Sequence, residues 1–236
     1  MRKMKKSIYL PERSQNKTSK QFYKSLGVKR LDKRKENITS KEIIDLDKEL
    51  DKTKRILDVG CGYGRIAIPL AKKGYYIEGI DITPDFIREA KKRARKEKLK
   101  IKFKTGDMTC LPYPSKSFDT IICLWSAFSE LISEKDQLTA IKEMLRVIKK
   151  GGKVIIDLPI PFKRKDAIIK IGEDEFKIKN NQIILARIDK IQAMPLYMHD
   201  KETLELLMKN SKIKKFKIFI KNFGGRKRLF LEFWKE

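Results

Sequence analysis

Short apolar runs alternate with amphipathic stretches through the middle of the chain, and this alternation predicts its main elements. The apolar runs predict strands at residues 55–60, 76–81, 100–104, 118–124 and 153–158. The amphipathic stretches between them predict helices over residues 63–73, 84–97 and 135–149. Strands that alternate with helices at this spacing favour an α/β fold, in which helices cover both faces of a parallel sheet.

The alternation stops after the fifth predicted strand. Residues 160–195 contain Gly-Glu-Asp and Asn-Asn turn signals between apolar runs, which predicts an inserted antiparallel hairpin or small sheet. Its strands are expected at residues 167–171, 175–179 and 182–191. Asp200 then caps a predicted helix over residues 201–209. Two last strands, 213–221 and 227–234, are joined by a tight turn that makes them antiparallel neighbours, so the sheet is expected to be mixed.

The first part of the chain follows a different pattern. Residues 1–38 are polar, basic and weakly periodic, which predicts a partly flexible arm. A short amphipathic helix is expected over residues 40–50, with Ser40 as its N-cap. We therefore divide the chain into an arm, 1–38, and one folded domain, 39–236.

Composition and charge narrow the class of protein. The chain has 236 residues, 41% of them hydrophobic, and a net charge of +26, which excludes collagen, a disulfide-stapled miniprotein and a membrane bundle. Three cysteines in apolar contexts and the lack of a signal-peptide pattern predict a cytoplasmic protein. Both ends are basic, with +11 over residues 1–35 and +9 over residues 160–236, while the middle is nearly neutral. This distribution suits RNA phosphates, but scattered lysines also fit a simple compositional bias.

Polar and glycine residues follow three successive predicted strands. Gly60-x-Gly62-x-Gly64 forms a turn before a helix, a device that brings backbone amides close to a ligand. Asp58 in this turn would oppose a pyrophosphate but suits a ligand with an ammonium group. Asp81 ends the second strand, where a carboxylate accepts hydrogen bonds from both hydroxyls of a ribose. Asp107 follows the third strand and, with the next residue, Met108, suits an adenine ring.

These motifs, together with residues 118–125 and the turn at residues 145–152, resemble the class I S-adenosylmethionine-dependent methyltransferases over residues 40–159 and again over 197–234. The resemblance implies a Rossmann-like, doubly wound, mostly parallel seven-stranded sheet with an antiparallel last strand. It also implies S-adenosyl-L-methionine as the cofactor, with no metal. The residues that it implies for cofactor binding are Asp58, Gly60, Cys61, Gly62, Gly64, Asp81, Ile82, Asp107, Met108, Leu124 and Trp125. Cys61 is interpreted as a packing residue rather than a nucleophile.

The methyl acceptor is less well defined by the sequence. Trp125, Tyr197 and His199 are candidates for catalysis, and each also has a purely structural interpretation. In the family, an insertion such as 160–195 often covers the substrate as a lid, although a surface hairpin is the alternative. A small molecule that accepts the methyl group on nitrogen or oxygen is the preferred acceptor. A tRNA or rRNA, a protein side chain and a cofactor-binding pseudoenzyme remain alternatives, and the sequence leaves the oligomeric state open.

Overall fold

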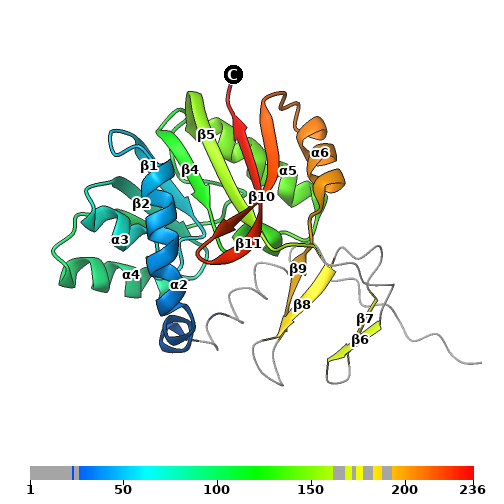
Figure 1. Cartoon of the computed structure of the whole chain (residues 1–236), viewed down its shortest axis with the longest axis horizontal. Helices are drawn as coiled ribbons and strands as arrows, with labels where there is room; N and C mark the ends of the chain where they lie inside the picture. The colour runs from blue at the N-terminus through cyan, green and yellow to red at the C-terminus, as the bar shows by residue number, and fades with distance from the viewer. Residues whose placement is uncertain (1–22, 24–26, 162–167, 172–173, 178–182, 188–192) are drawn as a thin grey trace, which may run out of the picture.

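The computed structural model describes residues 23, 27–161, 168–171, 174–177, 183–187 and 193–236. A seven-stranded sheet forms the centre of the protein, and helices pack on both of its faces (Figure 1). The strands of this sheet are β1 (Arg55–Val59), β2 (Tyr76–Asp81), β3 (Phe103–Thr105), β4 (Phe118–Cys123), β5 (Ile148–Leu158), β10 (Phe216–Phe223) and β11 (Arg226–Trp234). The helices are α2 (Val28–Glu49), α3 (Ala67–Lys72), α4 (Pro84–Lys96), the short 3₁₀ helix η2 (Ala127–Glu130), α5 (Glu134–Val147) and α6 (Lys201–Asn210). This arrangement confirms the predicted doubly wound α/β fold.

The order of the strands locates the edge of the sheet where a ligand would bind. The order is β10-β11-β5-β4-β1-β2-β3, in which β1 to β5 are parallel and β11 runs antiparallel to both of its neighbours. The predicted antiparallel last strand is therefore confirmed. The chain adds β2 and β3 on one side of β1 and then returns to place β4 on the other side. Because open α/β sheets bind ligands where the strand order reverses, the carboxyl ends of β1 and β4 are the expected site.

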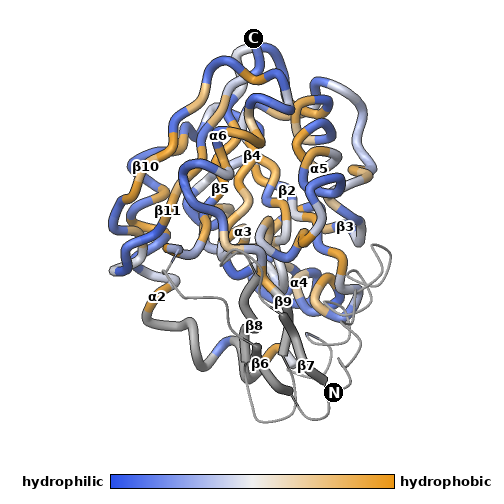
Figure 2. The backbone as a smooth tube through the Cα atoms, turned by 90° about the vertical axis from the view of Figure 1, so that its right-hand side faces the viewer, coloured by the Kyte–Doolittle hydropathy of each residue, from blue (hydrophilic) through white to orange (hydrophobic). Residues whose placement is uncertain are grey.

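Alternate residues of the central strands point to opposite faces and supply two hydrophobic cores. Leu57 of β1 and Ile121 of β4 pack in the core that also contains residues of α5 and α6. Their neighbours Ile56 and Ile122 pack in the core that contains residues of α2, α3 and α4. Figure 2 shows apolar stretches along the central strands and polar stretches on the outer surface. Since both faces are covered, a ligand reaches the sheet at the ends of its strands.

The helix α2 is longer than the sequence pattern predicts. It begins at Val28, whereas the amphipathic pattern predicts a helix from Ser40. Ser40 lies inside α2 and is exposed, so the predicted N-cap is wrong. The side chains that pack on the sheet start only at Ile43 and continue with Leu46. Hydrophobic periodicity reports burial, so it does not reveal the charged turns that come before them.

Other boundaries of the helices and strands agree with the prediction to within a few residues. The helix α3 and the strands β3, β5 and β10 begin at Ala67, Phe103, Ile148 and Phe216 rather than at residues 63, 100, 153 and 213. Asp200 caps α6 as predicted, because its carboxylate accepts a hydrogen bond of 2.9 Å from the amide of Thr203 in a capping box. In the part of the chain that the structure describes, no helix is both long and apolar enough to cross a bilayer.

The insertion after β5 is antiparallel, as predicted, and contains two pairs of strands. The strand β6 (Ile168–Ile171) pairs with β7 (Asp174–Lys177), and β8 (Ile183–Arg187) pairs with β9 (Ala193–Tyr197). The pattern predicts one strand over residues 182–191, but β8 ends at Arg187 and the chain forms β9 as its partner. The segments that connect these strands lie outside the described residues, so the function of the insertion as a lid stays a prediction.

Candidate functional site

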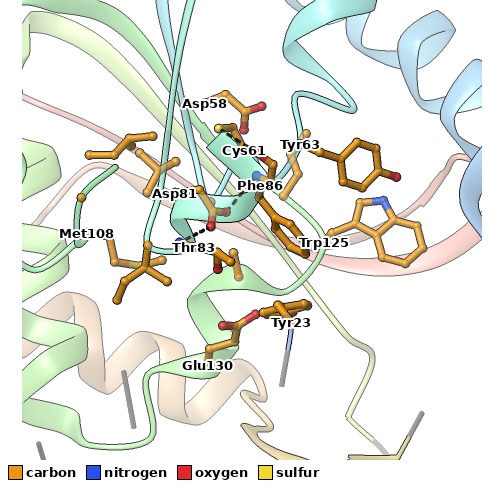
Figure 3. A pocket seen from close by; sticks show the side chains of 18 of the residues that line it. Tyr23, Asp58, Cys61, Tyr63, Asp81, Thr83, Phe86, Met108, Trp125 and Glu130 are labelled. Carbon is orange, nitrogen blue, oxygen red and sulfur yellow. Dashed lines mark hydrogen bonds between the residues drawn. The ribbon is translucent and has the colours of Figure 1, made fainter. Parts of the chain in front are cut away.

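A pocket lies at the carboxyl ends of β1, β2, β3 and β4, at the edge that the strand order indicates. The glycine turn after β1, the ends of β2 and β3, and the segment from β4 to η2 form its wall (Figure 3). Tyr23, from the chain before α2, also lines the pocket. The site therefore combines the residues that follow four parallel strands with one residue from the N-terminal region.

The glycine turn brings backbone groups to the wall of the pocket. The amides of Gly60 and Cys61 donate hydrogen bonds of 2.8 and 3.0 Å to the carbonyl oxygen of Ile80. Gly60 has a φ of 76°, in the left-handed region that favours glycine. A Cβ atom on Gly60 would lie 2.6 Å from the Cβ atom of Ala127 in η2. Glycine is therefore required here both for the backbone conformation and for the close approach of η2.

Asp81 connects the glycine turn with the end of β2 and the start of α4. Its Oδ2 atom accepts a hydrogen bond of 2.8 Å from the amide of Gly62, and its Oδ1 atom accepts one of 2.8 Å from the amide of Thr83. Burial raises the pKa of Asp81, although both hydrogen bonds act in the opposite direction. The carboxylate is thus fixed in position and poorly hydrated, which favours additional hydrogen bonds from hydroxyl groups of a ligand.

Asp58 is a buried carboxylate without a full set of partners. Its side chain is 2% exposed, and its Oδ2 atom has no hydrogen-bond partner within the described structure. Burial raises the pKa of Asp58 to about 7, against the opposite effect of the positive charge of Arg65. A buried oxygen without a donor is costly, so a ligand that presents an ammonium group would satisfy it.

The end of β3 contributes the third acidic side chain of the pocket. Asp107 and Met108 both line it. The Oδ1 atom of Asp107 accepts hydrogen bonds from the amide and the hydroxyl of Thr109, at 2.9 and 2.8 Å. These bonds hold the carboxylate at the end of the strand, beside the apolar side chain of Met108.

The chain bends sharply where β4 ends. Trp125 and Ser126 have φ angles of 58° and 64°, a left-handed conformation that is uncommon for residues with side chains. The amide of Ser126 donates to Asp157 of β5 at 3.2 Å, and its hydroxyl accepts from Arg228 of β11 at 2.8 Å. Arg228 also forms an ion pair with the buried carboxylate of Asp157, with N–O distances of 2.9 and 3.0 Å. Side chains of two neighbouring strands, β5 and β11, therefore stabilise this bend.

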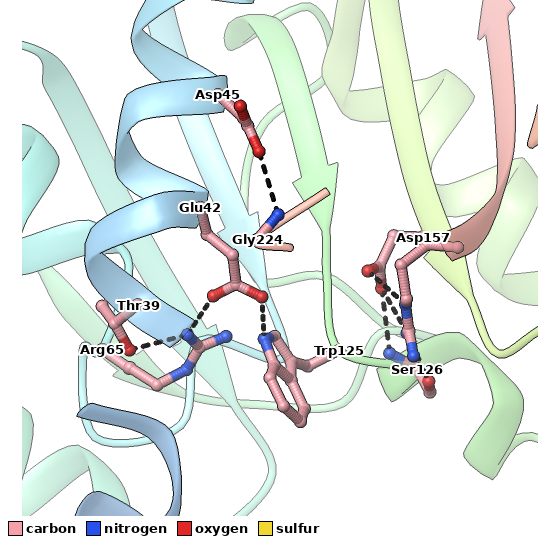
Figure 4. Close-up of polar contacts among 9 residues, drawn as sticks. Thr39, Glu42, Asp45, Arg65, Trp125, Ser126, Asp157 and Gly224 are labelled. Carbon is pink, nitrogen blue, oxygen red and sulfur yellow. Dashed lines mark hydrogen bonds and ion pairs between the residues drawn. The ribbon is translucent and has the colours of Figure 1, made fainter. Parts of the chain in front are cut away.

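Side chains from α2 and from the segment after the glycine turn hold the indole of Trp125 in place (Figure 4). Its Nε1 atom donates to the carboxylate of Glu42, a buried residue of α2. Arg65 donates to the other oxygen of the same carboxylate, and its guanidinium lies 4.8 Å from the centre of an indole ring. Since Arg65 and Trp125 line the pocket, Glu42 attaches α2 to the pocket wall.

Comparison with known proteins gives a consistent assignment. Residues 56–152 match a family described as a methyltransferase domain. A protein of Geobacillus sp. (strain WCH70), named as a methyltransferase, is 30% identical over 126 residues, which are 52% of this chain and 51% of that protein. A demethylmenaquinone methyltransferase of Deinococcus radiodurans is 34% identical over 111 residues, 46% of this chain and 44% of that protein. A solved SAM-dependent methyltransferase from Methanosarcina mazei has a TM-score of 0.62 and 22% identity, and covers 81% of this chain and 98% of its own.

The matched domain begins in β1 and ends in β5, and the remaining strands complete the seven-stranded sheet with β11 antiparallel. Residues 56–152 thus form a methyltransferase domain, and the chain has the seven-stranded fold of solved S-adenosylmethionine-dependent methyltransferases. It spans about half the length of the curated relatives that it matches.

The pocket contains ten of the eleven residues that the sequence predicts for cofactor binding. They are Asp58, Gly60, Cys61, Gly62, Asp81, Ile82, Asp107, Met108, Leu124 and Trp125. Gly64 does not line the pocket: its φ is 80°, and a Cβ atom there would lie 2.8 Å from the side chain of Ile68. Burial raises the pKa of the Cys61 thiol well above its usual value, in agreement with a packing role.

The three candidates for catalysis lie in different environments. Trp125 lines the pocket, whereas Tyr197 and His199 do not. His199 is 1% exposed, and its ring lies 4.5 Å from the ring of Tyr197 and 5.6 Å from that of Phe128. Burial lowers the pKa of His199 to about 4, so the imidazole is neutral at pH 7. A catalytic role of His199 would require it to act from outside the pocket lining.

Several residues of the site belong to no motif or periodic pattern in the sequence. Tyr23 and Glu130 line the pocket, and the Tyr23 hydroxyl donates a hydrogen bond of 2.6 Å to the Oε1 atom of Glu130. Glu42 reaches the site from α2, of which the pattern predicts only a short amphipathic helix over residues 40–50 and no contact with the site. The one local clue to Glu130 is its position five residues after Trp125, one of the residues that the sequence predicts for cofactor binding.

The contact between the glycine turn and η2 can be tested with Gly60→Ala. The substitution places a side chain at a left-handed φ, which costs about 1–2 kcal/mol, and adds a clash with Ala127 of roughly 1–3 kcal/mol. Gly74→Ala is the matched control, because Gly74 has a φ of 91° but open space around its Cα atom. In urea unfolding, Gly60→Ala should lose clearly more stability than Gly74→Ala. Equal losses of stability in the two variants would show that Ala127 of η2 does not clash with a side chain at position 60.

Proposed function

We propose that this protein transfers a methyl group from S-adenosyl-L-methionine to a nitrogen or oxygen atom of a small-molecule acceptor. The observation that carries the proposal is the set of carboxylates at the ends of three adjacent parallel strands, Asp58, Asp81 and Asp107, around a glycine turn. Asp58 contributes a buried oxygen that lacks a donor, and such an oxygen suits a cationic ligand. The residues present therefore fit the cofactor that the family implies.

Each part of the pocket has a defined task in this proposal. Asp58 and the amides of the glycine turn would hold the methionine portion of the cofactor, Asp81 its ribose and Asp107 with Met108 its adenine. When bound, the cofactor supplies a methyl group that its sulfonium already activates. The protein then has to orient the acceptor in line with that group and to exclude water, which is a proximity effect. Trp125, fixed by Glu42, and Leu124 form the wall on the acceptor side.

A small molecule is the preferred acceptor for two reasons. The pocket is acidic although the whole chain carries +26, so the ligands that it selects differ from an RNA backbone. The relative from Deinococcus radiodurans is named for a small-molecule substrate, demethylmenaquinone. RNA is the second candidate, because β10 and β11, at one edge of the sheet, carry the basic residues Lys217, Lys221, Arg226 and Lys227.

Labelling with a radioactive methyl donor tests the proposal. The full chain is incubated with labelled S-adenosyl-L-methionine and a cell extract that is afterwards separated into small molecules, RNA and protein. We expect label in the small-molecule fraction, and Asp58→Asn should abolish it. Label in RNA that is lost on nuclease treatment would replace the small-molecule acceptor by RNA. If calorimetry detects no binding of the product S-adenosylhomocysteine at micromolar concentration, the cofactor assignment is wrong.

The affinity for S-adenosylhomocysteine should rise with pH and then level off. Asp58 is largely protonated below its pKa of about 7, and a ligand ammonium binds its ionised form. The dissociation constant should therefore fall by up to about tenfold per pH unit between pH 5 and 7. For the free protein the sign is opposite: the raised pKa contributes stability below pH 3.8 that is lost as the pH rises through 7. Calorimetric titration with S-adenosylhomocysteine from pH 5 to 8 measures the affinity, and the affinity of Asp58→Asn should not depend on pH in this range.

A further inference from the structure

One carboxylate of the pocket has no task in the binding of the cofactor. The acidic residues that line the pocket are Asp58, Asp81, Asp107 and Glu130. The first three follow β1, β2 and β3 and correspond to the family's cofactor motifs. Glu130 stands apart from them, at the end of η2, on the segment that follows β4 (Figure 3). Its carboxylate therefore faces the pocket from the side where the acceptor would enter.

The position of Glu130 relative to the glycine turn is fixed by the fold. The 3₁₀ helix η2 starts directly after the left-handed Ser126, which Asp157 and Arg228 hold in place. Ala127, at the start of η2, approaches Gly60 so closely that a Cβ atom there would collide with it. The backbone between Ala127 and Glu130 is a single short helix, so Glu130 cannot shift without moving these contacts.

Tyr23 fixes the side chain of Glu130. The hydroxyl of Tyr23 donates to the Oε1 atom of Glu130 at 2.6 Å, a short bond typical of a hydroxyl with an ionised carboxylate. The ring of Tyr23 packs on Phe86 of α4, with 5.5 Å between the ring centres, and Phe86 packs edge-on against Tyr63. Burial and the charge of Glu130 raise the pKa of Tyr23 well above 10, so its hydroxyl stays a donor at neutral pH. The pair thus connects α4 with η2 across the pocket.

The charge of the pocket indicates the chemical class of the acceptor. Against the four carboxylates, Arg65 is the one basic residue of the pocket lining within the described chain. Its guanidinium already forms an ion pair with the buried Glu42. The pocket is therefore negative although the whole chain has a net charge of +26. A carboxylate in addition to the three assigned to the cofactor favours a second positively charged ligand, the acceptor.

We propose that Glu130, oriented by Tyr23, binds the methyl acceptor, that this acceptor is an amine, and that Glu130 takes the proton which the amine releases. This inference rests on the proposed function and adds a substrate class and a catalytic residue to it. The amine binds as an ammonium and first gives one proton to the Glu130 carboxylate, which frees the lone pair of the nitrogen. The nitrogen then forms a bond to the methyl carbon while the bond from that carbon to sulfur breaks and leaves its electron pair on sulfur. The Tyr23 hydroxyl keeps its proton and holds the carboxylate toward the nitrogen.

Binding of two cofactor analogues tests the location of the Glu130 charge without an acceptor. Sinefungin carries an amine in place of the methylated sulfonium, whereas S-adenosylhomocysteine carries a neutral sulfur there. Glu130→Gln keeps the acceptor atom for Tyr23 but removes the charge. By calorimetry, it should weaken sinefungin by about tenfold or more, as expected for a lost charged hydrogen bond, and change S-adenosylhomocysteine less than twofold. The matched control Glu134→Gln, at an exposed residue that does not line the pocket, should change neither.

The outcomes separate the two proposals. Equal weakening of both analogues by Glu130→Gln, or no weakening of either, overturns the role of Glu130 and leaves the cofactor assignment intact. Failure of the unchanged protein to bind either analogue overturns the proposed function itself.

The class of acceptor is tested by charge fractionation. Small molecules of an extract are separated on cation- and anion-exchange resins before incubation with labelled donor and protein. We expect the methylated product from the fraction that a cation exchanger retains, and a loss of at least about a hundredfold in rate with Glu130→Gln. Tyr23→Phe should lower the rate about tenfold and shift the rising limb of the pH–rate profile, which a purely structural role would leave unchanged. A product from the anionic fraction, or a full rate with Glu130→Gln, overturns the proposal.

Discussion

Replacing Asp81 by alanine is expected to weaken the binding of S-adenosylhomocysteine by at least about a hundredfold. The carboxylate accepts hydrogen bonds from the amides of Gly62 and Thr83, so its removal loosens the glycine turn and the start of α4 together. Each hydrogen bond to a charged group contributes about 1.5–3 kcal/mol, and a hundredfold change corresponds to roughly 2.7 kcal/mol. The ligand also loses the oxygen atoms that would accept from its ribose hydroxyls.

Asp85→Ala is the control for this prediction. Asp85 lies four residues later, in the first turn of α4, and forms an exposed ion pair with Arg88. Its loss removes the same charge near the pocket without touching the glycine turn, so affinity should change less than about threefold. Calorimetry of both variants distinguishes a specific contact from a general effect of charge. An Asp81→Ala protein that binds as tightly as the Asp85→Ala protein would show that Asp81 does not contact the ligand.

Breaking the ion pair between Arg228 and Asp157 is expected to have the largest effect on the free energy of unfolding. Arg228→Met leaves the carboxylate of Asp157, which is 1% exposed, buried without its partner. Removal of one member of a buried pair costs about 3–5 kcal/mol, which corresponds to roughly 6–20 °C in Tm for a chain of this size. The hydroxyl of Ser126 loses its donor as well, so the left-handed bend loses part of its support.

Three variants make the test specific. Lys227→Met changes the neighbouring exposed residue of β11 and should cost less than about 0.5 kcal/mol. The double variant Arg228→Met with Asp157→Asn removes both charges and should recover part of the lost stability. In a Trp234→Phe background, Trp125 is the one remaining tryptophan, and its fluorescence should shift when Arg228 is replaced. Arg228→Met with the stability of Lys227→Met would show that the pair does not stabilise the fold.

The site and the acceptor side differ in how far the sequence predicts them. Gly60, Asp58 and Asp81 stand at recognisable distances from strands that their own apolar pattern reveals, so their place at one sheet edge follows from the alternation of strands and helices. Ten of the predicted cofactor residues accordingly line one pocket. Gly64 shows the limit of this reasoning, since it belongs to the same motif but serves the packing of α3.

The contacts between distant segments show what a local pattern misses. Glu42 and Trp125 are 83 residues apart, and Tyr23 and Glu130 are 107 apart. Neither pair has a periodicity or a motif that connects its members. The charged turns at the start of α2 likewise carry no hydrophobic stripe, so the helix begins well before the predicted Ser40.

The sequence by itself determined the order of strands and helices, the doubly wound sheet and the acidic residues at its carboxyl edge. These features follow from local periodicity and from the fact that parallel strands end at one edge. The tertiary structure alone decided that His199 is buried beside Phe128 outside the pocket, and that Tyr23 and Glu130 meet across it. Such contacts depend on how helices pack on the two faces of the sheet, because packing brings together residues that no short-range pattern relates.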